Sequence, residues 1–156
     1  QVIFNDTIIL NYLNAKMIRD KISYCSQNPY LFEDTLKNNI TLFDQNFDEK
    51  KFNKVLNICK VNEIIEKKNI KIKDNIAESG LNLSGGEKQR ISLARSLYKN
   101  FDVLILDEST NSLNGQMERE IMENILLYCR EKIIITCSHN LSLQELFNKR
   151  LRIKKI

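Results

Sequence analysis

A capped glycine turn is the first feature of this chain whose residue types could do chemistry. Ser84 is a good N-cap and Glu87 follows three residues later, which predicts a helix that opens with a capping box. Gly85 and Gly86 fill the first turn, although each lowers helix propensity by about 1 kcal/mol relative to alanine. Close approach of another molecule would explain both glycines, because bare backbone N–H groups at the positive end of a helix bind anions such as phosphate. Taken alone, the motif also fits a capped helix with no ligand.

Three further polar residues follow apolar runs of the chain. Asp107 and Glu108 end the run 103–106, and His139, the only histidine, comes shortly after the run 133–137. Each run predicts a buried strand, and ligands bind open α/β sheets outside the carboxyl ends of their strands. The stretch between Glu108 and His139 covers a loop, a helix and a strand, which returns the chain to the same sheet edge. By themselves, Asp107 is also compatible with a cap and His139 with a structural residue.

The elements that must position these residues alternate between strands and helices. Compact apolar runs predict buried strands at 22–25, 103–106 and 133–137. Apolar positions at helical spacing mark two inner helix faces, namely Phe52, Val55, Leu56 and Cys59 behind a cap at Asp48, and Ile91, Ala94, Leu97 and Tyr98. Buried strands that alternate with helices predict a parallel sheet in an α/β fold.

Shorter elements are expected toward both ends of the chain. Residues 2–4 and 7–10 predict two short strands around a polar turn. The elements expected after the second buried strand are a helix at about 116–129, the strand at 133–137, a short helix that opens with Ser142 and Glu145 as a second capping box, and a strand with Leu151 and Ile153.

The composition of the 156 residues is that of an ordinary globular protein, with 42% apolar and 28% charged residues. The net charge of +4 comes from lysines scattered among acidic residues, which favours a solvated surface over a nucleic-acid-binding face. No apolar run reaches the roughly 18 residues of a membrane helix, and no signal-peptide pattern is visible, so any membrane link is expected through a partner or a portion not present. The cysteines show no C-x-x-C pairing, which predicts reduced core thiols at Cys25, Cys59, Cys129 and Cys137.

Four motifs in a fixed order resemble the ATP-binding cassettes of ABC transporters. Residues 83–97 resemble the signature helix of that family, and 104–108 resemble its Walker B strand. Upstream, 23–29 resemble the glutamine-bearing loop, and downstream 133–139 resemble the strand that ends in a switch histidine. The resemblance implies a P-loop NTPase-like parallel sheet with an inserted helical subdomain, divided into an α/β core at 1–29 and 101–156 and a helical and signature subdomain at 30–100.

The resemblance also implies a role for each site residue in the hydrolysis of ATP with Mg²⁺. Asp107 and Gln27 would support the metal, and Glu108 would activate the attacking water as general base. His139 would contact the γ-phosphate and orient Glu108 and the water, so that the implied catalytic residues are Glu108, His139 and Gln27. In a head-to-tail dimer of such cassettes, ATP bound to one subunit is covered by the signature turn of the other, which consists here of Ser84, Gly85, Gly86 and Glu87.

Two looser matches favour a transporter over a cassette used in DNA repair or translation. Residues 31–40 resemble the segment after the glutamine loop in exporter-type cassettes, and 78–80 resemble their transmission loop. The expected partners are a second nucleotide-binding domain and a transmembrane permease domain, with no nucleic acid, at the cytoplasmic face of the cell membrane. The alternatives are a non-transport ABC ATPase and a cassette remnant that binds a partner without hydrolysing ATP.

The chain departs from the family pattern at two points. Asn114 stands where the family usually has aspartate, which keeps the size and one acceptor but loses the charge. No G-x-x-x-x-G-K-[ST] phosphate-binding loop occurs in the sequence, and the family order would place it upstream of Gln1. The chain is therefore expected to be the carboxyl-terminal portion of a cassette, inactive alone but part of an ATPase in the complete protein.

Overall fold

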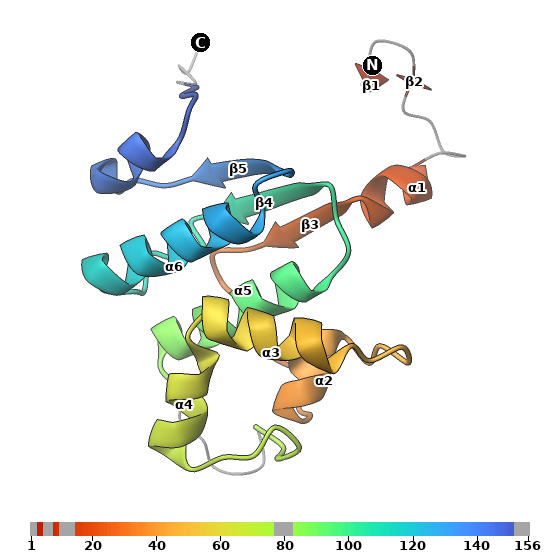
Figure 1. Ribbon diagram of the computed structural model, residues 1–156, viewed down its shortest axis with the longest axis vertical. Helices are drawn as coiled ribbons and strands as arrows, with labels where there is room; N and C mark the ends of the chain where they lie inside the picture. The colour runs from red at the N-terminus through yellow and green to blue at the C-terminus, as the bar shows by residue number, and fades with distance from the viewer. Residues whose placement is uncertain (1–2, 5–7, 10–14, 77–82, 152–156) are drawn as a thin grey trace.

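Three parallel strands form the centre of the fold. The structure is a computed structural model that describes residues 3–4, 8–9, 15–76 and 83–151. The sheet consists, in spatial order, of β3 (Ile22–Cys25), β4 (Val103–Asp107) and β5 (Ile133–Cys137) (Figure 1). Both pairings are parallel, as predicted, and every strand is separated from the next by at least one helix. The expected α/β fold with a parallel sheet is therefore confirmed.

The two faces of this sheet have different surroundings. Leu104 and Leu106 on β4 are fully buried, on the face of the sheet opposite the exposed one, and α5 packs against the neighbouring strand β3. The register places Tyr24, Ile133 and Ile135 on the opposite face, where these side chains are 55%, 61% and 48% exposed. Because successive strand residues point to opposite faces, this difference follows directly from the alternation along each strand. One face of the sheet is thus apolar and open, and the prediction of a buried strand is wrong for β5, in which no residue is buried.

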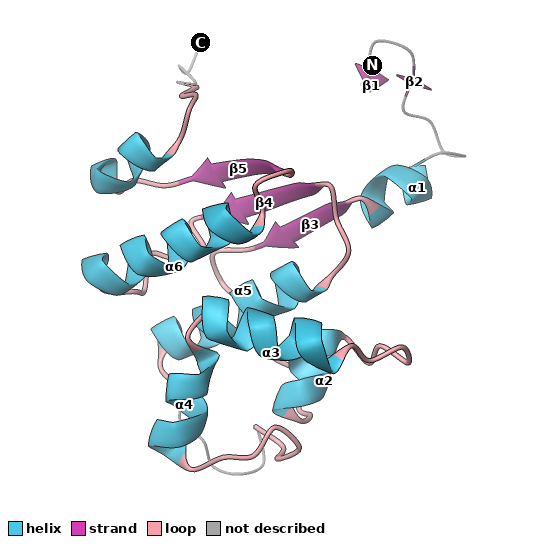
Figure 2. Cartoon of the chain, viewed as in Figure 1, coloured by secondary structure: helices cyan, strands magenta, loops and turns pink. Residues whose placement is uncertain are grey.

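The signature helix α5 (Gly85–Tyr98) lies between the sheet and a group of shorter helices. It packs against β3 on one side, and on its other sides it contacts α2 (Leu36–Thr41), α3 (Glu49–Ile58) and α4 (Val61–Lys68) (Figure 2). The predicted inner face is confirmed, since Ile91, Ala94 and Leu97 are completely buried. Contacts on several sides fix the position of this helix relative to the sheet. The division of the chain at residues 30 and 100 stays a prediction.

Local sequence signals explain where the short helices begin. Asp48 caps α3 by accepting a hydrogen bond from the Lys51 N–H at 2.9 Å, as predicted. Thr35 caps α2 in the same way, by accepting from the Asn38 N–H at 3.0 Å. Each bond satisfies a backbone donor that the first helical turn leaves without a partner. The predicted apolar set of this region is buried throughout, at Phe52, Val55, Leu56 and Cys59.

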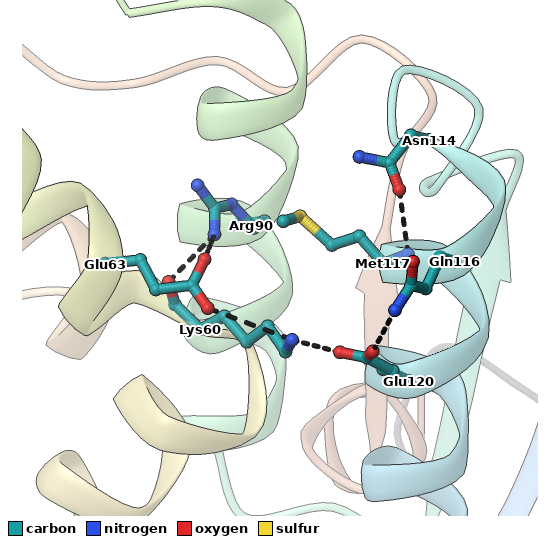
Figure 3. A network of polar contacts seen from close by, with 7 residues as sticks. All are labelled: Lys60, Glu63, Arg90, Asn114, Gln116, Met117 and Glu120. Carbon is teal, nitrogen blue, oxygen red and sulfur yellow. Dashed lines mark hydrogen bonds and ion pairs between the residues drawn. The ribbon is translucent and has the colours of Figure 1, made fainter.

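Charged side chains connect three helices on one side of the fold (Figure 3). Arg90 on α5 donates to the Lys60 carbonyl and to the Glu63 carboxylate, both at 2.9 Å. Lys60 in turn pairs with Glu120 on α6 (Gly115–Tyr128). A buried cation is tolerated only where its charge is met by partners, and Arg90 is 7% exposed. This chain of contacts anchors α4 and α5 to α6.

The segment after β5 differs from its prediction. A 3₁₀ helix, η1 (Leu141–Leu146), begins after Asn140, whose Oδ1 accepts from the Ser142 N–H at 3.0 Å. Glu145 pairs instead with Arg119 on α6. The expected capping box of Ser142 and Glu145 is therefore wrong, because an asparagine two residues earlier takes the cap and a tertiary ion pair takes the glutamate.

The ends of the chain meet their predictions in part. β1 (Ile3–Phe4) pairs antiparallel with β2 (Ile8–Ile9), which confirms the two short strands. The six-residue helix α1 (Ala15–Asp20) was not predicted, because so short a helix shows little apolar periodicity. Leu151 is 92% exposed and belongs to no strand, contrary to the prediction, and Ile153 lies outside the described residues.

The cysteines fit the prediction of core thiols at three positions out of four. Cys25, Cys59 and Cys129 are buried, and burial raises the pKa of Cys129 to about 11. Cys137 is exposed, because it follows Ile135 by two residues and so belongs to the open face of the sheet. All four thiols are free.

We expect this chain to self-associate, because its open apolar sheet face and the exposed edge of β5 favour association with a second copy. Light scattering is expected to give a mass above the 18.3 kDa of the monomer that rises with concentration. Ile135→Lys should shift the chain toward the monomer, since it places a charge on the open face. Leu127→Lys is the matched control, because Leu127 is also an exposed apolar residue, at 58% against 48% for Ile135, but lies on α6. A monomer at every concentration would contradict the expectation.

Candidate active site

The ends of β4 and β5 bring the predicted carboxylate and histidine together. Asp107 pairs with Cys137 in the sheet register, and the next N–H, of Glu108, donates to the Cys137 carbonyl at 3.0 Å. One of the two carboxylate oxygens of Glu108, Oε1, lies 2.8 Å from the Nε2 atom of His139. The structure therefore places these two side chains in direct contact at the carboxyl edge of the sheet, where the sequence analysis expected them.

Two amides bind the other oxygen of the same carboxylate. Gln27 and Asn111 each donate a side-chain N–H to the Glu108 Oε2 atom at 2.7 Å. A carboxylate oxygen has room for two hydrogen-bond donors, so the two amides fill the acceptor positions of Oε2. The Glu108 side chain is 24% exposed, whereas that of His139 is 88% exposed. The carboxylate is thus sheltered and oriented, and the imidazole faces the solvent from which a ligand would come.

The backbone at Glu108 has an uncommon conformation for a residue with a side chain. Its φ of 46° lies in the left-handed region, where a non-glycine residue is strained by on the order of 1–3 kcal/mol. The hydrogen bond to Cys137 and a bond from the Asn111 N–H to the Glu108 carbonyl at 3.3 Å offset this cost. A strained backbone conformation that the surrounding hydrogen bonds hold in place is typical of functional sites.

Asp107, the implied metal-binding residue, belongs to the open face of the sheet. Its Oδ2 accepts a hydrogen bond from the Tyr24 hydroxyl at 2.8 Å, and this bond is the main cause that raises the pKa of Tyr24. Mg²⁺ is usually bound by one or two carboxylates together with substrate phosphates and water, so a single aspartate next to Glu108 fits this ion. Across residues 15–76 and 83–151, no three His, Cys, Asp or Glu side chains form a metal-sized cluster.

The predicted capping box at the start of α5 is confirmed. The Ser84 hydroxyl accepts from the Glu87 N–H at 3.2 Å, and the Glu87 carboxylate accepts from the Ser84 N–H at 2.8 Å. Lys68 lies 3.3 Å from the same carboxylate. Burial acts to raise the pKa of Glu87, but the Ser84 N–H and Lys68 outweigh it, so that the pKa is lowered. Glu87 therefore stays ionised and rigidifies the signature turn.

The two glycines of that turn have a reason within the chain itself. A Cβ atom on Gly86 would lie 2.8 Å from the Ser112 carbonyl oxygen, closer than side-chain carbons approach backbone. A Cβ on Gly85 would lie 3.3 Å from the Ser112 hydroxyl. The sequence analysis attributed both glycines to the approach of another molecule. The structure shows that the loop after Glu108 already packs against them.

Gln89 is a site residue that sequence reasoning missed. It is 3% exposed, and its amide oxygen accepts from the Ser112 N–H at 2.9 Å while its amide nitrogen donates to the Gln27 carbonyl at 3.4 Å. One buried side chain of α5 therefore connects the loop after β3 to the loop after β4. No pattern in the sequence distinguished Gln89, since Ser92 and Ser96 on the same side of α5 are polar as well.

The structure connects the predicted site residues in two separate groups. Gln27 and His139 both bind Glu108, whereas within the described residues no hydrogen bond joins Ser84 or Glu87 to Glu108. The two groups are connected by the hydrogen bonds of Gln89 and by the packing of Ser112 against the two glycines. Asn114, the departure from the family pattern, caps α6 by accepting from the Met117 N–H at 2.9 Å (Figure 3). Residues 78–80, the implied transmission loop, lie outside the described residues.

The arrangement of sheet, packed helix and strand-end carboxylates is that of an ATP-binding cassette. The profile of the family described as "ABC transporter" matches residues 1–111, which is more than half of the sequence, and the chain belongs to this family.

Several proteins, two of them named for export, are similar to this chain. The multidrug resistance-like ATP-binding protein MdlA of Escherichia coli is 34% identical over 139 residues, which cover 89% of this chain and 23% of MdlA. The microcin-J25 export ATP-binding/permease protein McjD of Escherichia coli is 32% identical over 92% of this chain and 24% of its own length. A solved bacterial Atm1-family ABC exporter with ATP bound superimposes with a TM-score of 0.71 at 29% identity, over 80% of this chain and 22% of that one. The chain thus spans about a quarter of the length of the relatives it matches.

Gly86→Ala is expected to destabilise the chain, because the added methyl group must displace the Ser112 carbonyl. Overpacking of this kind costs about 1–3 kcal/mol, which a urea denaturation curve would register as a lower midpoint. Gly115→Ala is the matched control at a helix start, since no atom lies within 4 Å of its added Cβ. That variant should be neutral or more stable by about 0.5–1 kcal/mol. Equal midpoints for the two variants would refute the packing argument.

Proposed function

We propose that this chain is part of the nucleotide-binding domain of an ABC exporter, which couples the binding and hydrolysis of MgATP to export of a substrate across a membrane. The observation that carries the proposal is the Glu108 carboxylate, bound by the Gln27 amide and in contact with His139. A carboxylate oriented on both oxygens at a sheet edge is well placed to act on a water molecule. Phosphoryl transfer to water requires such positioning and little covalent chemistry from the protein.

Glu108 acts as general base in this mechanism. Its side chain accepts a proton from the attacking water as the water approaches the γ-phosphate. The amides of Gln27 and Asn111 bind Oε2. The other oxygen, Oε1, lies next to the exposed imidazole of His139 and is the oxygen proposed to accept the proton. The strained turn limits the freedom of the carboxylate, so little reorganisation is needed when the water arrives.

His139 acts on the phosphate side of the reaction. Its imidazole is 88% exposed while one ring nitrogen contacts Glu108, so the remaining ring edge is available to a bound nucleotide. A neutral imidazole has a single N–H donor, so His139 would donate to the γ-phosphate either as the imidazolium or by turning its Nε2–H from Glu108 to the nucleotide. A donor at that position stabilises the charge that develops there in the transition state. Asp107 and Gln27 would hold Mg²⁺, which neutralises phosphate charge when it is bound.

The signature turn acts on ATP bound to a second cassette. Gly85 and Gly86 present backbone N–H groups at the start of a 14-residue helix, which is a seat for an anion, and the Ser84 hydroxyl lies beside them while the Ser84 N–H is taken up by Glu87. The packing of Ser112 against the two glycines keeps this turn rigid. The proposed assembly is therefore a head-to-tail dimer in which each site combines Glu108 of one subunit with Ser84 of the other.

The proposed partner in the membrane is a permease domain, contacted at the cytoplasmic face. Two relatives are named as export ATP-binding/permease proteins, one from Rickettsia conorii and one from Escherichia coli. Residues 31–40, which include the α2 helix, are proposed to form part of the contact. None of the described helices has the length and apolar character that crossing a bilayer requires.

In a complete cassette that carries these residues, Glu108→Gln is expected to lower ATP turnover by about 100-fold or more while ATP binding persists. Glutamine keeps the shape of the side chain but does not accept the water proton. The substitution therefore removes stabilisation of the transition state and leaves the binding of ATP intact. The measurement is steady-state ATPase activity together with ATP-dependent dimerisation, which this variant should retain and prolong.

Two further variants make this experiment specific. Ser84→Arg should also lower turnover, but through failed dimerisation, because a bulky cation blocks the approach of the opposing nucleotide. Glu123→Gln is the control, since Glu123 is an exposed carboxylate on α6 that pairs with Arg119. Turnover near the wild-type rate in Glu108→Gln would refute the assignment of the general base.

A further inference from the structure

A second carboxylate near the site is buried without capping a helix. Glu118 on α6 is 4% exposed. The start of α6 is capped by Asn114 through the Met117 N–H, so this role is already taken. Burial of an ionised carboxylate costs several kcal/mol unless hydrogen bonds compensate for the lost water. The partners of Glu118 therefore indicate what the side chain does.

Both oxygens of Glu118 bind loops at the carboxyl edge of the sheet. The Thr110 hydroxyl donates to Oε1 at 2.6 Å, and the Asn140 side-chain amide donates to Oε2 at 2.6 Å. Thr110 lies two residues after Glu108, and Asn140 directly follows His139. A single side chain of α6 thus connects the loop that carries the carboxylate to the loop that carries the imidazole.

The orientation of the Asn140 amide is determined from its other end. Its Oδ1 accepts from the Ser142 N–H at 3.0 Å and from the Ser142 hydroxyl at 2.8 Å. The amide nitrogen must therefore face Glu118, because reversing the amide would break the bond from the Ser142 N–H and place the amide oxygen against the Glu118 carboxylate. The Asn140 N–H also donates to the Ser138 hydroxyl at 3.0 Å, which tightens the loop on both sides of His139.

The imidazole of His139 has little packing of its own, since 88% of the side chain is exposed. Its position relative to Glu108 must then come from the backbone that carries it. We propose that Glu118 is a positioning residue that keeps His139 in contact with Glu108, by binding Thr110 and Asn140 on the two loops. This inference rests on the proposed roles of Glu108 and His139, but it concerns their geometry before any nucleotide binds.

The chain offers a direct probe of this geometry, because His139 is its only histidine. The carbon-bound imidazole protons therefore give one set of histidine resonances in an NMR spectrum of the 156-residue chain. Glu108→Gln defines the resonance position expected when the contact with the carboxylate is lost. Glu118→Met, which has a similar shape but no acceptor oxygens, should move the resonance in the same direction and by a comparable amount.

Two variants of similar shape separate positioning from general damage to the fold. Glu118→Gln should leave the resonance near the wild-type position, because its amide oxygen accepts from Asn140 while its nitrogen donates to the rotatable Thr110 hydroxyl. Glu123→Gln, on the exposed side of the same helix, should leave it unchanged. A Glu118→Met chain whose resonance stays at the wild-type position would overturn the proposal.

A pair of substitutions that exchanges the carboxylate and the amide between positions 118 and 140 keeps the test decisive even if Glu118→Met fails to fold. Asn140→Asp places two carboxylates within hydrogen-bond distance, so it should shift the His139 resonance through like-charge repulsion. Adding Glu118→Gln to that variant restores a hydrogen bond with its direction reversed, because the new amide donates to the new carboxylate at position 140. The His139 resonance should then return to the wild-type position. Failure of the second substitution to restore it would contradict the proposal.

Turnover provides an independent reading in a complete cassette. Loss of a positioning contact should lower kcat by about 10- to 100-fold in Asn140→Asp, with the KM for ATP little changed and kcat recovered in the exchanged pair. If the cassette proved not to hydrolyse ATP, the proposed function would fail, while the resonance experiment would still decide the role of Glu118.

Discussion

The hydrogen bond from the Glu108 N–H to the Cys137 carbonyl extends the pairing of β4 and β5 one residue beyond the strands. The geometry of the site depends on this extension. It sets the turn at which Glu108 takes its left-handed conformation, and it brings the loop of His139 alongside. A parallel pairing displaced by one residue would send Asp107 and the neighbouring apolar side chains to the wrong faces of the sheet. The apolar residues of the strands therefore fix the geometry of the proposed catalytic site by fixing the register.

The buried helix α5 transmits this geometry to the signature turn. Gln89 binds the backbone of the Gln27 loop and the backbone at Ser112, and Gly86 admits the Ser112 carbonyl at a distance that no side chain allows. The turn that would cover a neighbour's ATP and the loop that follows Glu108 are therefore packed against each other. In the proposed dimer, movement of one surface would be communicated to the other through these contacts.

Features set by local pattern could be predicted from the sequence, and features set by tertiary contacts could not. The three parallel strands, the Ser84 capping box and the Asp48 cap depend on residues a few positions apart, and the structure confirms them. The expected burial of the strand at 133–137 is wrong, because one face of the sheet is open. The meeting of Glu108 and His139 followed from the rule that parallel strands end at one edge. Glu118 and Gln89 escaped prediction because their partners lie on other elements, and Glu145 was misassigned because Arg119 competes for it.

The central claim is that Glu108 and His139 act on ATP as one unit. The most direct test is a double-mutant cycle on single-turnover hydrolysis in a complete cassette, with Glu108→Gln, His139→Ala and the two combined. Residues that act as a unit give strongly non-additive losses. The geometry predicts that the double variant loses about as much rate as the more severe single variant. Losses that multiply would show that the two side chains act independently and would contradict the account.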